Sequence, residues 1–314
     1  KKDGGNYWEE KHISAYNLLV DHPMYYADTL NEAPANGTVI CADRMHIDYI
    51  NRFYPSVKRC FFLPTAGTDT GDFEEQIIFS ERPIDFLMIG NYKYIDLPKD
   101  MDTDQIFRLL QKQPERTMEE AAEIVYKKNH SDKADSIKEL KKYIEKYRFT
   151  AVTITALYRE RLLRMLLQHG YHIEVYGDGW QNSSCFSEKG FHLHPPVSVT
   201  EGLQLMSQAK FVLNNMAWFK DGGSERIYNA MLQGALVLTD RSRYLEKDYD
   251  DYSVIWYELN DMEAVLPKIH NLLVSQDAKP DEMRKKAYEI TYQKNRWINR
   301  AKDFLKYIHR IQKR

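Results

Sequence analysis

The residues best suited to chemistry lie in the segment 211–240, where a basic side chain follows a pair of glycines. Gly222 and Gly223 allow the backbone to approach a ligand closely, and Ser224 is a good N-cap for a helix. Arg226 lies one turn into that helix. The free N–H groups and positive dipole end of a helix N-terminus favour an anion, and an arginine can add a bidentate charge. The segment is therefore typical of a site that holds a nucleotide diphosphate.

Two apolar runs must position this site. Residues 211–213 and 235–238 are short and bounded by turn residues, as expected for strands of a parallel sheet that is buried on both faces. The helix between them repeats apolar residues at Ile227 and Met231 and ends at Gly234. The segment thus predicts a strand, a polar loop, a capped helix and a second strand.

The same alternation of strands and helices continues along the chain. From residue 84 onward it predicts a parallel sheet with helices on both faces. Before that, expected strands at 16–23, 38–43 and 59–64 and a helix at 46–55 make only half of a doubly wound domain. We therefore expect an α/β protein with two Rossmann-like domains built on parallel sheets, the N-terminal one incomplete.

The connection at 64–83 sets the expected domain boundaries. We assign 1–82 to a partial N-terminal domain and 83–280 to a C-terminal domain that binds the ligand. The charge-rich segment 102–147 has a helical period and is expected to form an inserted helical layer with a mostly solvated face. Residues 281–314 predict one long amphipathic helix that packs back toward the N-terminal domain.

Composition excludes several classes of function. The net charge of −2 gives no electrostatic case for a nucleic-acid partner. The three cysteines are few and widely spaced, which favours a reducing compartment and argues against a disulfide framework or a zinc site. No apolar run approaches eighteen residues and no signal-peptide pattern is present, so we expect a cytoplasmic protein without a membrane span.

Other turns join the first one at the predicted ligand site. Ligands of open α/β sheets bind beyond the carboxyl ends of the strands, where the turns 90–92, 177–180 and 214–224 would converge. No GxGxxG or GxxxxGK[ST] pattern occurs, so a nicotinamide enzyme or a P-loop nucleotidase is not expected. Asp102 and Asp104 match a metal-binding DxD pair, but a helix start, where aspartate is a common N-cap, is the favoured interpretation.

At this point the chain resembles a known family. The runs SERIYNAM (224–231) and GALVLTD (234–240) are similar to the donor-binding segment of group 1-type GT-B glycosyltransferases, and most similar to the spore-maturation, CgeB-like branch. The runs VYGDGW (175–180) and FVLN (211–214) occur in the expected order. The resemblance implies two Rossmann-like domains that face each other across a cleft. The C-terminal one would hold a nucleotide-sugar donor, and the N-terminal one, residues 1–82, would shape the acceptor side. It also implies that the first strands of the N-terminal domain are missing here.

The resemblance implies a set of donor-binding residues: Gly90, Asn91, Gly177, Asp178, Gly179, Trp180, Asn214, Asn215, Gly223, Ser224, Glu225, Arg226 and Asn229. Arg226 and the backbone N–H groups at the start of its helix would neutralise the leaving diphosphate. Asn214 and Asn215 either hold sugar hydroxyls or cap the strand end, and Trp180 either covers the donor or packs internally. No metal and no cofactor are expected; the co-substrate is a nucleotide-diphosphate sugar, with a UDP-sugar favoured.

One position departs from the family pattern. Asn229 stands where a carboxylate is usual, eight residues after Asp221, and an amide carries no charge. Glu225 lies on the same helix face, where it either replaces that carboxylate or complements the helix dipole.

The catalytic candidates lie in the N-terminal domain. In related GT-B enzymes a histidine at the rim of the cleft contacts the donor sugar, and His22 follows an expected strand. Asp21 would orient it or act as a base, or the Asp-His-Pro run is simply a turn. The implied activity is metal-independent, retaining sugar transfer to an unidentified acceptor. A non-catalytic nucleotide-sugar-binding scaffold subunit and a GT-B-type sugar-nucleotide epimerase are the alternatives.

Overall fold

The computed structural model describes residues 7–130 and 136–312. By their contacts the residues fall into two compact units, and each unit is assembled from separate stretches of the chain. Unit 1 comprises Lys1–Thr65, Leu97–Ala151 and Trp218–Gly223, and unit 2 comprises Ala66–Asp96, Val152–Ala217 and Ser224–Arg314.

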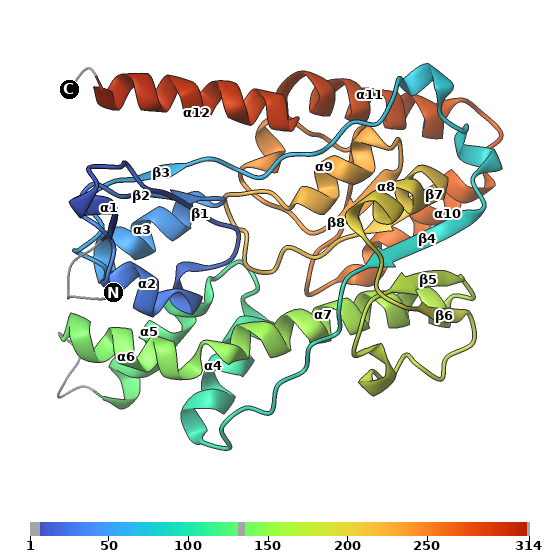
Figure 1. Cartoon of the computed structure of the whole chain (residues 1–314). Helices are drawn as coiled ribbons and strands as arrows, with labels where there is room; N and C mark the ends of the chain where they lie inside the picture. The colour runs from blue at the N-terminus through green and yellow to red at the C-terminus, as the bar shows by residue number, and fades with distance from the viewer. Residues whose placement is uncertain (1–6, 131–135, 313–314) are drawn as a thin grey trace. The chain divides into compact units, whose positions relative to one another are not determined.

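Unit 1 contains a three-stranded parallel sheet in the order β1-β2-β3 (Figure 1). The strands are β1 (Tyr16–Leu19), β2 (Thr38–Cys41) and β3 (Cys60–Phe62). Strand β2 is central and buried along its whole length, as its apolar sequence predicts. Asp43 lies between β2 and α3 (Arg44–Phe53), and it caps this helix by accepting a hydrogen bond from the Met45 backbone N–H. The short helices α1 (Tyr7–Glu10) and α2 (Ala27–Asn31) complete this part.

The predicted helical segment forms three helices, α4 (Met101–Lys112), α5 (Met118–Asn129) and α6 (Ile137–Tyr147). They belong to unit 1, whereas the sequence boundaries place them in the C-terminal domain. Helix α5 packs on α4 and α6, and α6 packs on α3. The reason is the apolar face of α6, where Leu140 and Ile144 are fully buried rather than part of a solvated layer.

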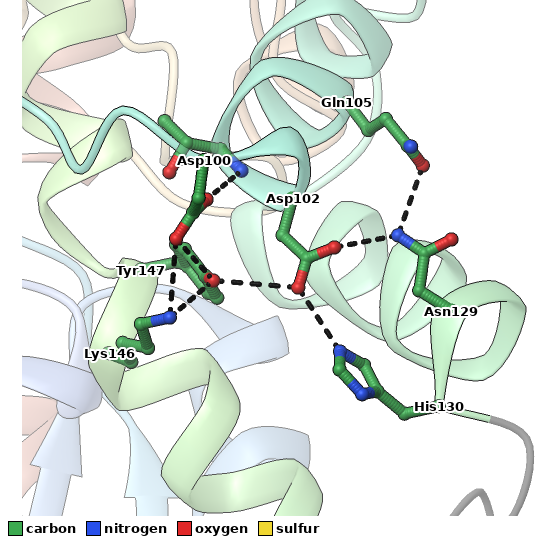
Figure 2. Close-up of polar contacts among 8 residues, drawn as sticks. Asp100, Asp102, Gln105, Asn129, His130, Lys146 and Tyr147 are labelled. Carbon is green, nitrogen blue, oxygen red and sulfur yellow. Dashed lines mark hydrogen bonds and ion pairs between the residues drawn. The ribbon is translucent and has the colours of Figure 1, made fainter.

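Polar side chains tie these three helices together (Figure 2). Asp100, rather than Asp102, is the N-cap of α4, and it accepts a hydrogen bond from the Tyr147 hydroxyl at 2.9 Å. Asp102 accepts one from the Asn129 amide at 2.6 Å and lies 3.1 Å from Nε2 of His130. Both carboxylate oxygens of Asp102, the first residue of the DxD pair, thus have partners at the end of α5.

Unit 2 contains a six-stranded parallel sheet in the order β6-β5-β4-β7-β8-β9. The strands are β4 (Ile84–Ile89), β5 (Ile173–Tyr176), β6 (Phe191–His194), β7 (Ala209–Leu213), β8 (Leu236–Thr239) and β9 (Ile255–Trp256). The strand order reverses between β4 and β7, which are neighbours. Such a reversal is the switch point at which open α/β sheets bind ligands.

The helices of this sheet follow the predicted alternation. They are α7 (Phe149–Gln168), α8 (Val199–Gln208), α9 (Glu225–Leu232), α10 (Leu266–Val274), α11 (Lys279–Lys294) and α12 (Trp297–Gln312). Single 3-10 turns occur at Pro23–Tyr25, Phe73–Glu75, Phe79–Glu81, Trp180–Asn182, Leu245–Lys247 and Met262–Val265. Within the described part of the chain, no helix is long and apolar enough to cross a membrane.

The prediction of one uninterrupted C-terminal helix is wrong, because the chain breaks between α11 and α12. The backbone of Gly67 pairs with the residues at this break. Its N–H donates to the Asn295 carbonyl at 2.8 Å, and its carbonyl accepts from the Trp297 N–H at 3.2 Å. Asn295 is the C-cap of α11. Strand-like pairing of these backbone groups replaces the helical bonds that would continue α11.

Candidate functional site

The switch point brings two of the predicted turns side by side. Strands β4 and β7 pair in parallel, with Leu87 opposite Val212, so the residues that follow them lie at the same sheet edge. These residues are Gly90 and Asn91 after β4 and Asn214 after β7. The topology thus confirms that these two stretches converge.

The turn after β5 lies against the turn after β4. The Gly90 N–H donates to the Tyr176 carbonyl at 2.8 Å, and the Asp178 N–H donates to the Asn91 side-chain oxygen at 2.9 Å. Gly177 has a φ of +153°, and a Cβ there would overlap the Gly90 carbonyl. These glycines are therefore needed for the close packing of two backbone turns.

Trp180 is part of this packing. It is fully buried, its indole N–H donates to the Gly90 carbonyl at 2.7 Å, and its ring lies 5.2 Å from that of Tyr92. The structure fits the internal-packing alternative for this side chain. Gly179 has a φ of +84°, and a Cβ there would overlap the Tyr92 carbonyl.

Arg226 points to the junction of these turns. Its Nη1 donates to the side-chain oxygen of Asn214 at 2.7 Å, and its Nη2 lies 2.9 Å from the place where a Cβ on Gly90 would stand. Burial, with a contribution from the neighbouring Arg159 charge, lowers the pKa of Arg226 to about 9. The guanidinium therefore stays charged at neutral pH in a partly desolvated position.

Arg159 is a functional candidate that sequence reasoning missed. Its Nη1 donates to the Asn91 carbonyl at 2.6 Å and lies 3.8 Å from the same Cβ position on Gly90. Its Nε is buried and has no hydrogen-bond partner among the residues described. Burial lowers the pKa of Arg159. Among the described residues, 7–130 and 136–312, neither Arg159 nor Arg226 has a carboxylate partner. Two cations without counter-ions, next to each other at the strand ends, make a site suited to an anion.

Only helical period could have pointed to Arg159. It follows Ala156 by three residues and precedes Leu163 by four, and both of these are buried. The sequence Arg159-Glu160-Arg161 instead suggests an exposed, charged turn of helix. Glu160, however, is buried. Its carboxylate is satisfied there by hydrogen bonds that it accepts from the Tyr92 hydroxyl at 2.6 Å and from two serine hydroxyls.

Asn214 and Asn215 are both buried and held by protein groups. The Asn214 amide donates to the Thr239 hydroxyl at 2.9 Å, which turns its oxygen toward Arg226. Asn215 accepts from the Ala217 N–H at 3.3 Å. The first asparagine thus orients an arginine, and the second holds the backbone just after the strand.

The paired glycines approach protein, not open space. Gly222 forms an antiparallel bridge with Asp43, and the Gly223 carbonyl accepts from the Thr65 hydroxyl at 2.7 Å. Ser224 is the N-cap residue of α9, as predicted, but its side chain makes no capping hydrogen bond. The close approach predicted for a ligand is therefore made to the backbone of unit 1, to which residues 218–223 belong.

Asn229 is also engaged by protein. Its side-chain oxygen accepts from the Thr68 N–H at 2.8 Å, and its amide nitrogen lies 3.5 Å from Oε1 of Glu225. Asn229 is buried and Glu225 is exposed. Of Asn229 and Glu225, only the glutamate is thus accessible in this structure.

The two catalytic candidates differ in exposure. Asp21 is exposed, whereas His22 is buried in unit 1. The Nδ1 of His22 accepts from the Met24 N–H at 3.1 Å, and its Nε2 lies 3.3 Å from Glu119. Because the Nδ1 lone pair caps a turn, the geometry gives His22 an anchoring role and leaves Asp21 as the accessible group.

His22 shares a buried cluster with other polar side chains. The His46 ring lies 4.5 Å from that of His22, and the Tyr49 ring lies 4.8 Å from it. Burial, followed by the nearby His22, holds the pKa of His46 well below its usual value. His46 is therefore neutral at physiological pH.

Comparison with known proteins gives a family match and several structural matches. Residues 159–306 match the family model described as glycosyl transferase-like. By sequence, no curated protein matches the chain. Sucrose-phosphate synthase (tll1590) from Thermosynechococcus elongatus superposes with a TM-score of 0.55 at 10% identity, covering 97% of this chain and 70% of that one.

Two further solved structures are similar. An alpha-glucosyltransferase in complex with UDP and a 13-mer DNA containing a HMU base has a TM-score of 0.52 at 14% identity, covering 94% of this chain and 71% of that one. TarM has a TM-score of 0.50 at 14% identity, covering 94% of this chain, which spans 50% of the length of TarM. At these identities the likeness shows the fold, and the family match covers the part of the chain that carries both arginines. Residues 159–306 are therefore similar to a glycosyl transferase-like family, and the chain has the GT-B fold.

Proposed function

We propose that the chain is a glycosyltransferase that moves a sugar from a nucleotide-diphosphate sugar to an acceptor still to be identified. The observation that carries the proposal is the pair Arg159 and Arg226, two guanidiniums at the ends of β4 and β7 that have no carboxylate partner among the residues the structure describes. Negative charge develops on the diphosphate as the sugar–phosphate bond breaks, and fixed cations at that position stabilise the transition state.

A UDP-sugar is the favoured donor. The similar alpha-glucosyltransferase has been solved with UDP and, in another complex, with UDP-glucose. The run SERIYNAM (224–231) supports placement in the CgeB-like branch of group 1 enzymes. These observations make UDP and UDP-glucose the first probes to use.

The proposed reaction is metal-independent and retaining. Two arginines can meet the charge of the leaving diphosphate, and a departing phosphate oxygen beside the anomeric carbon can take the acceptor proton. Such a mechanism needs no strong protein base. The buried His22, whose Nδ1 accepts a backbone hydrogen bond and whose Nε2 faces Glu119, fits that requirement.

A second candidate function is a non-catalytic nucleotide-sugar-binding subunit. Asn229 motivates it, because its side-chain oxygen accepts from the Thr68 N–H and its amide carries no charge. In that case the donor would bind at the same arginines without being turned over.

A release assay separates these functions. The protein is incubated with radiolabelled UDP-glucose and other nucleotide sugars, with and without glycan, peptide and small-molecule acceptors, and free UDP and labelled products are quantified. A transferase gives UDP and a labelled product, both lost in Arg226→Ala and retained in Arg161→Ala, a change of an exposed arginine on α7. Binding without UDP release would favour the scaffold, and an altered sugar without transfer would favour an epimerase.

A further inference from the structure

The ends of β7, β8 and β9 are joined by hydrogen bonds within unit 2. The Asn214 N–H donates to the Leu238 carbonyl at 2.9 Å, and the Tyr257 N–H donates to the Thr239 carbonyl at 3.0 Å. Because β8 pairs in parallel with both β7 and β9, Tyr257 lies at the same sheet edge as Asn214. Three neighbouring strands thus end at the edge where the Asn214 side chain contacts Arg226.

Tyr257 adds a side-chain contact to this edge. The residue is buried, and its hydroxyl donates to the Asn214 carbonyl at 2.7 Å. The same hydroxyl accepts from the Asn215 amide at 3.4 Å. Burial, followed by the Asp240 charge, raises the pKa of Tyr257 well above its usual value, so the hydroxyl keeps the proton that it donates. The hydroxyl thus holds the backbone of Asn214 from the side of β9.

Tyr257 is also a neighbour of the two arginines of the candidate site. The hydrogen bond from Asn215 and the charges of Arg159 and Arg226 lower its pKa, against the effect of burial. The hydroxyl therefore lies close enough to both guanidiniums to feel their charges, but it is neutral and gives them no counter-ion. A phenol at this place supports the strand end and leaves the positive charge of the site intact.

The contacts form a continuous chain from Tyr257 to Arg226. The Tyr257 hydroxyl holds the Asn214 carbonyl, and the Asn214 side-chain oxygen accepts from Nη1 of Arg226 at 2.7 Å. Asn214 is fully buried, so removal of the hydroxyl would leave its carbonyl without this partner and away from water, which is costly. We expect the backbone at Asn214 to move toward a new partner, and its side chain to move with it.

We propose that Tyr257 is a positioning residue for Arg226 and that it acts through Asn214. The Tyr257 hydroxyl fixes the backbone of Asn214, and the amide oxygen of Asn214 then directs the guanidinium toward the place proposed for the diphosphate. The effect on the orientation of Arg226 does not depend on what the site binds. The consequence for donor affinity rests on the proposed function, so the two effects are tested by separate measurements.

Nuclear magnetic resonance of the arginine side chains tests the positioning without any ligand. The Nε–H signal of Arg226 is assigned in isotope-labelled protein by its loss in Arg226→Lys. In Tyr257→Phe, which removes one oxygen atom and keeps the buried ring, we expect this signal to move by more than its line width. An unmoved Arg226 signal in Tyr257→Phe would overturn the proposal.

Tyr288→Phe is the matched control for this measurement. Tyr288 is also buried, and its hydroxyl also donates to a backbone carbonyl, that of Gly71 at 3.2 Å. Both variants therefore lose a tyrosine hydrogen bond of the same kind, and urea denaturation shows that both remain folded. The Arg226 signal should stay in place in Tyr288→Phe, and an equal movement in both variants would show that any loss of such a bond disturbs the arginine.

Calorimetric titration of UDP measures the consequence for binding. We expect the Kd of Tyr257→Phe to be at least about fivefold higher than that of the wild type, as for loss of one hydrogen bond, whereas Tyr288→Phe should bind like the wild type. An unchanged Kd in a Tyr257→Phe protein whose Arg226 signal moves would overturn the role of Tyr257 in donor binding. If the wild-type protein does not bind UDP, the proposed function fails, and the Arg226 signal alone decides whether Tyr257 positions the arginine.

A double-mutant cycle shows whether the effect passes through Asn214. Once Asn214→Ala has removed the amide oxygen, the Tyr257 hydroxyl has no side chain to direct toward Arg226. Adding Tyr257→Phe to Asn214→Ala should therefore change the Kd for UDP by less than about twofold. A further loss of about fivefold in the Asn214→Ala background would show that Tyr257 acts by another route, and the proposed chain of contacts would be wrong.

Discussion

Arg226 donates from Nη1 to the side-chain oxygen of Asn214 at 2.7 Å, so a neutral amide rather than a carboxylate orients this guanidinium. The Asn214 amide is itself fixed, because it donates to the Thr239 hydroxyl. A carboxylate at this position would hold the arginine equally well but would cancel its charge. The amide thus orients Arg226 and leaves its charge available for an anion.

The first prediction is that Asn214→Asp weakens nucleotide binding. The substitution is nearly isosteric, and it gives Arg226 an internal counter-ion that competes with the diphosphate. We expect the Kd for UDP to rise at least about tenfold, as for loss of one charge-assisted hydrogen bond. Isothermal titration calorimetry measures it, and Asn182→Asp adds the same charge at an exposed site as a control. Equal affinities of the three proteins would argue against the role of Asn214.

The second prediction concerns Arg159. Replacing it with glutamine keeps most of its length but removes the second charge beside Gly90, so UDP affinity should fall about tenfold or more. Arg161→Gln changes an exposed arginine on the same helix and should leave affinity unchanged. If both substitutions lowered UDP affinity by the same factor, the overall charge of α7, rather than the position of Arg159, would determine binding.

The third prediction separates steric overlap from backbone strain. Gly170 and Gly179 have almost the same φ, +83° and +84°, but a Cβ on Gly170 meets nothing within 4 Å, whereas one on Gly179 would overlap the Tyr92 carbonyl. Gly170→Ala should therefore cost about 1 kcal/mol of unfolding free energy, from conformation alone. Gly179→Ala should cost at least about 2 kcal/mol more. Urea denaturation measures both, and equal losses would contradict the packing of the two turns.

The fourth prediction is a pH dependence of stability that comes from Asp43. Burial raises its pKa from 3.8 to about 6, although the hydrogen bonds that it accepts from the Asp221 and Met45 N–H groups lower it; of the nearby charges, that of Asp221 raises the pKa and that of His22 lowers it. Cys41, whose own pKa the Asp43 charge raises, also faces this carboxyl, and Arg44 pairs with Asp221. A carboxyl whose pKa is raised by folding stabilises the fold below its unfolded pKa, and this contribution is lost as the pH rises through about 6.

The measurement is the free energy of unfolding of wild-type protein and Asp43→Asn between pH 4 and pH 7. Wild-type stability should fall relative to the variant by about 2 kcal/mol over that range, with the change centred between the two pKa values. A constant difference across the range would show that Asp43 does not titrate there.

Features that depend on neighbouring residues in the sequence could be predicted, whereas features that depend on residues far apart in the sequence could not. Short apolar runs such as 211–213 predicted the strands, because burial on both faces leaves a local signal. The break at Asn295 could not be predicted, since it depends on backbone pairing with the distant Gly67. The contact of Gly222 with Asp43 could not be predicted either. A glycine indicates that another group approaches the backbone closely, but it does not show whether that group belongs to a ligand or to the protein.

The candidate site shows the same division. Arg226 was predicted because a helix N-terminus behind a glycine turn is a recognisable local pattern. Arg159 was missed because its proposed role depends on the contact that α7 makes with the turn at Asn91. His22 was predicted from its place after a strand, whereas its burial follows from Glu119 on a helix that the sequence boundaries placed in the other domain.

Calorimetric titration of UDP into wild-type protein and the variants Arg159→Gln, Arg226→Ala and Arg161→Gln tests the central claim most directly. Two guanidiniums that lack a carboxylate partner within the described part of the chain should bind one diphosphate per chain, and high salt should weaken this binding. We predict one-to-one binding in the wild type and in Arg161→Gln, at least tenfold weaker binding in Arg159→Gln, and no measurable binding in Arg226→Ala. Binding of UDP with the same affinity in all four proteins would contradict the assignment of these arginines as the diphosphate site.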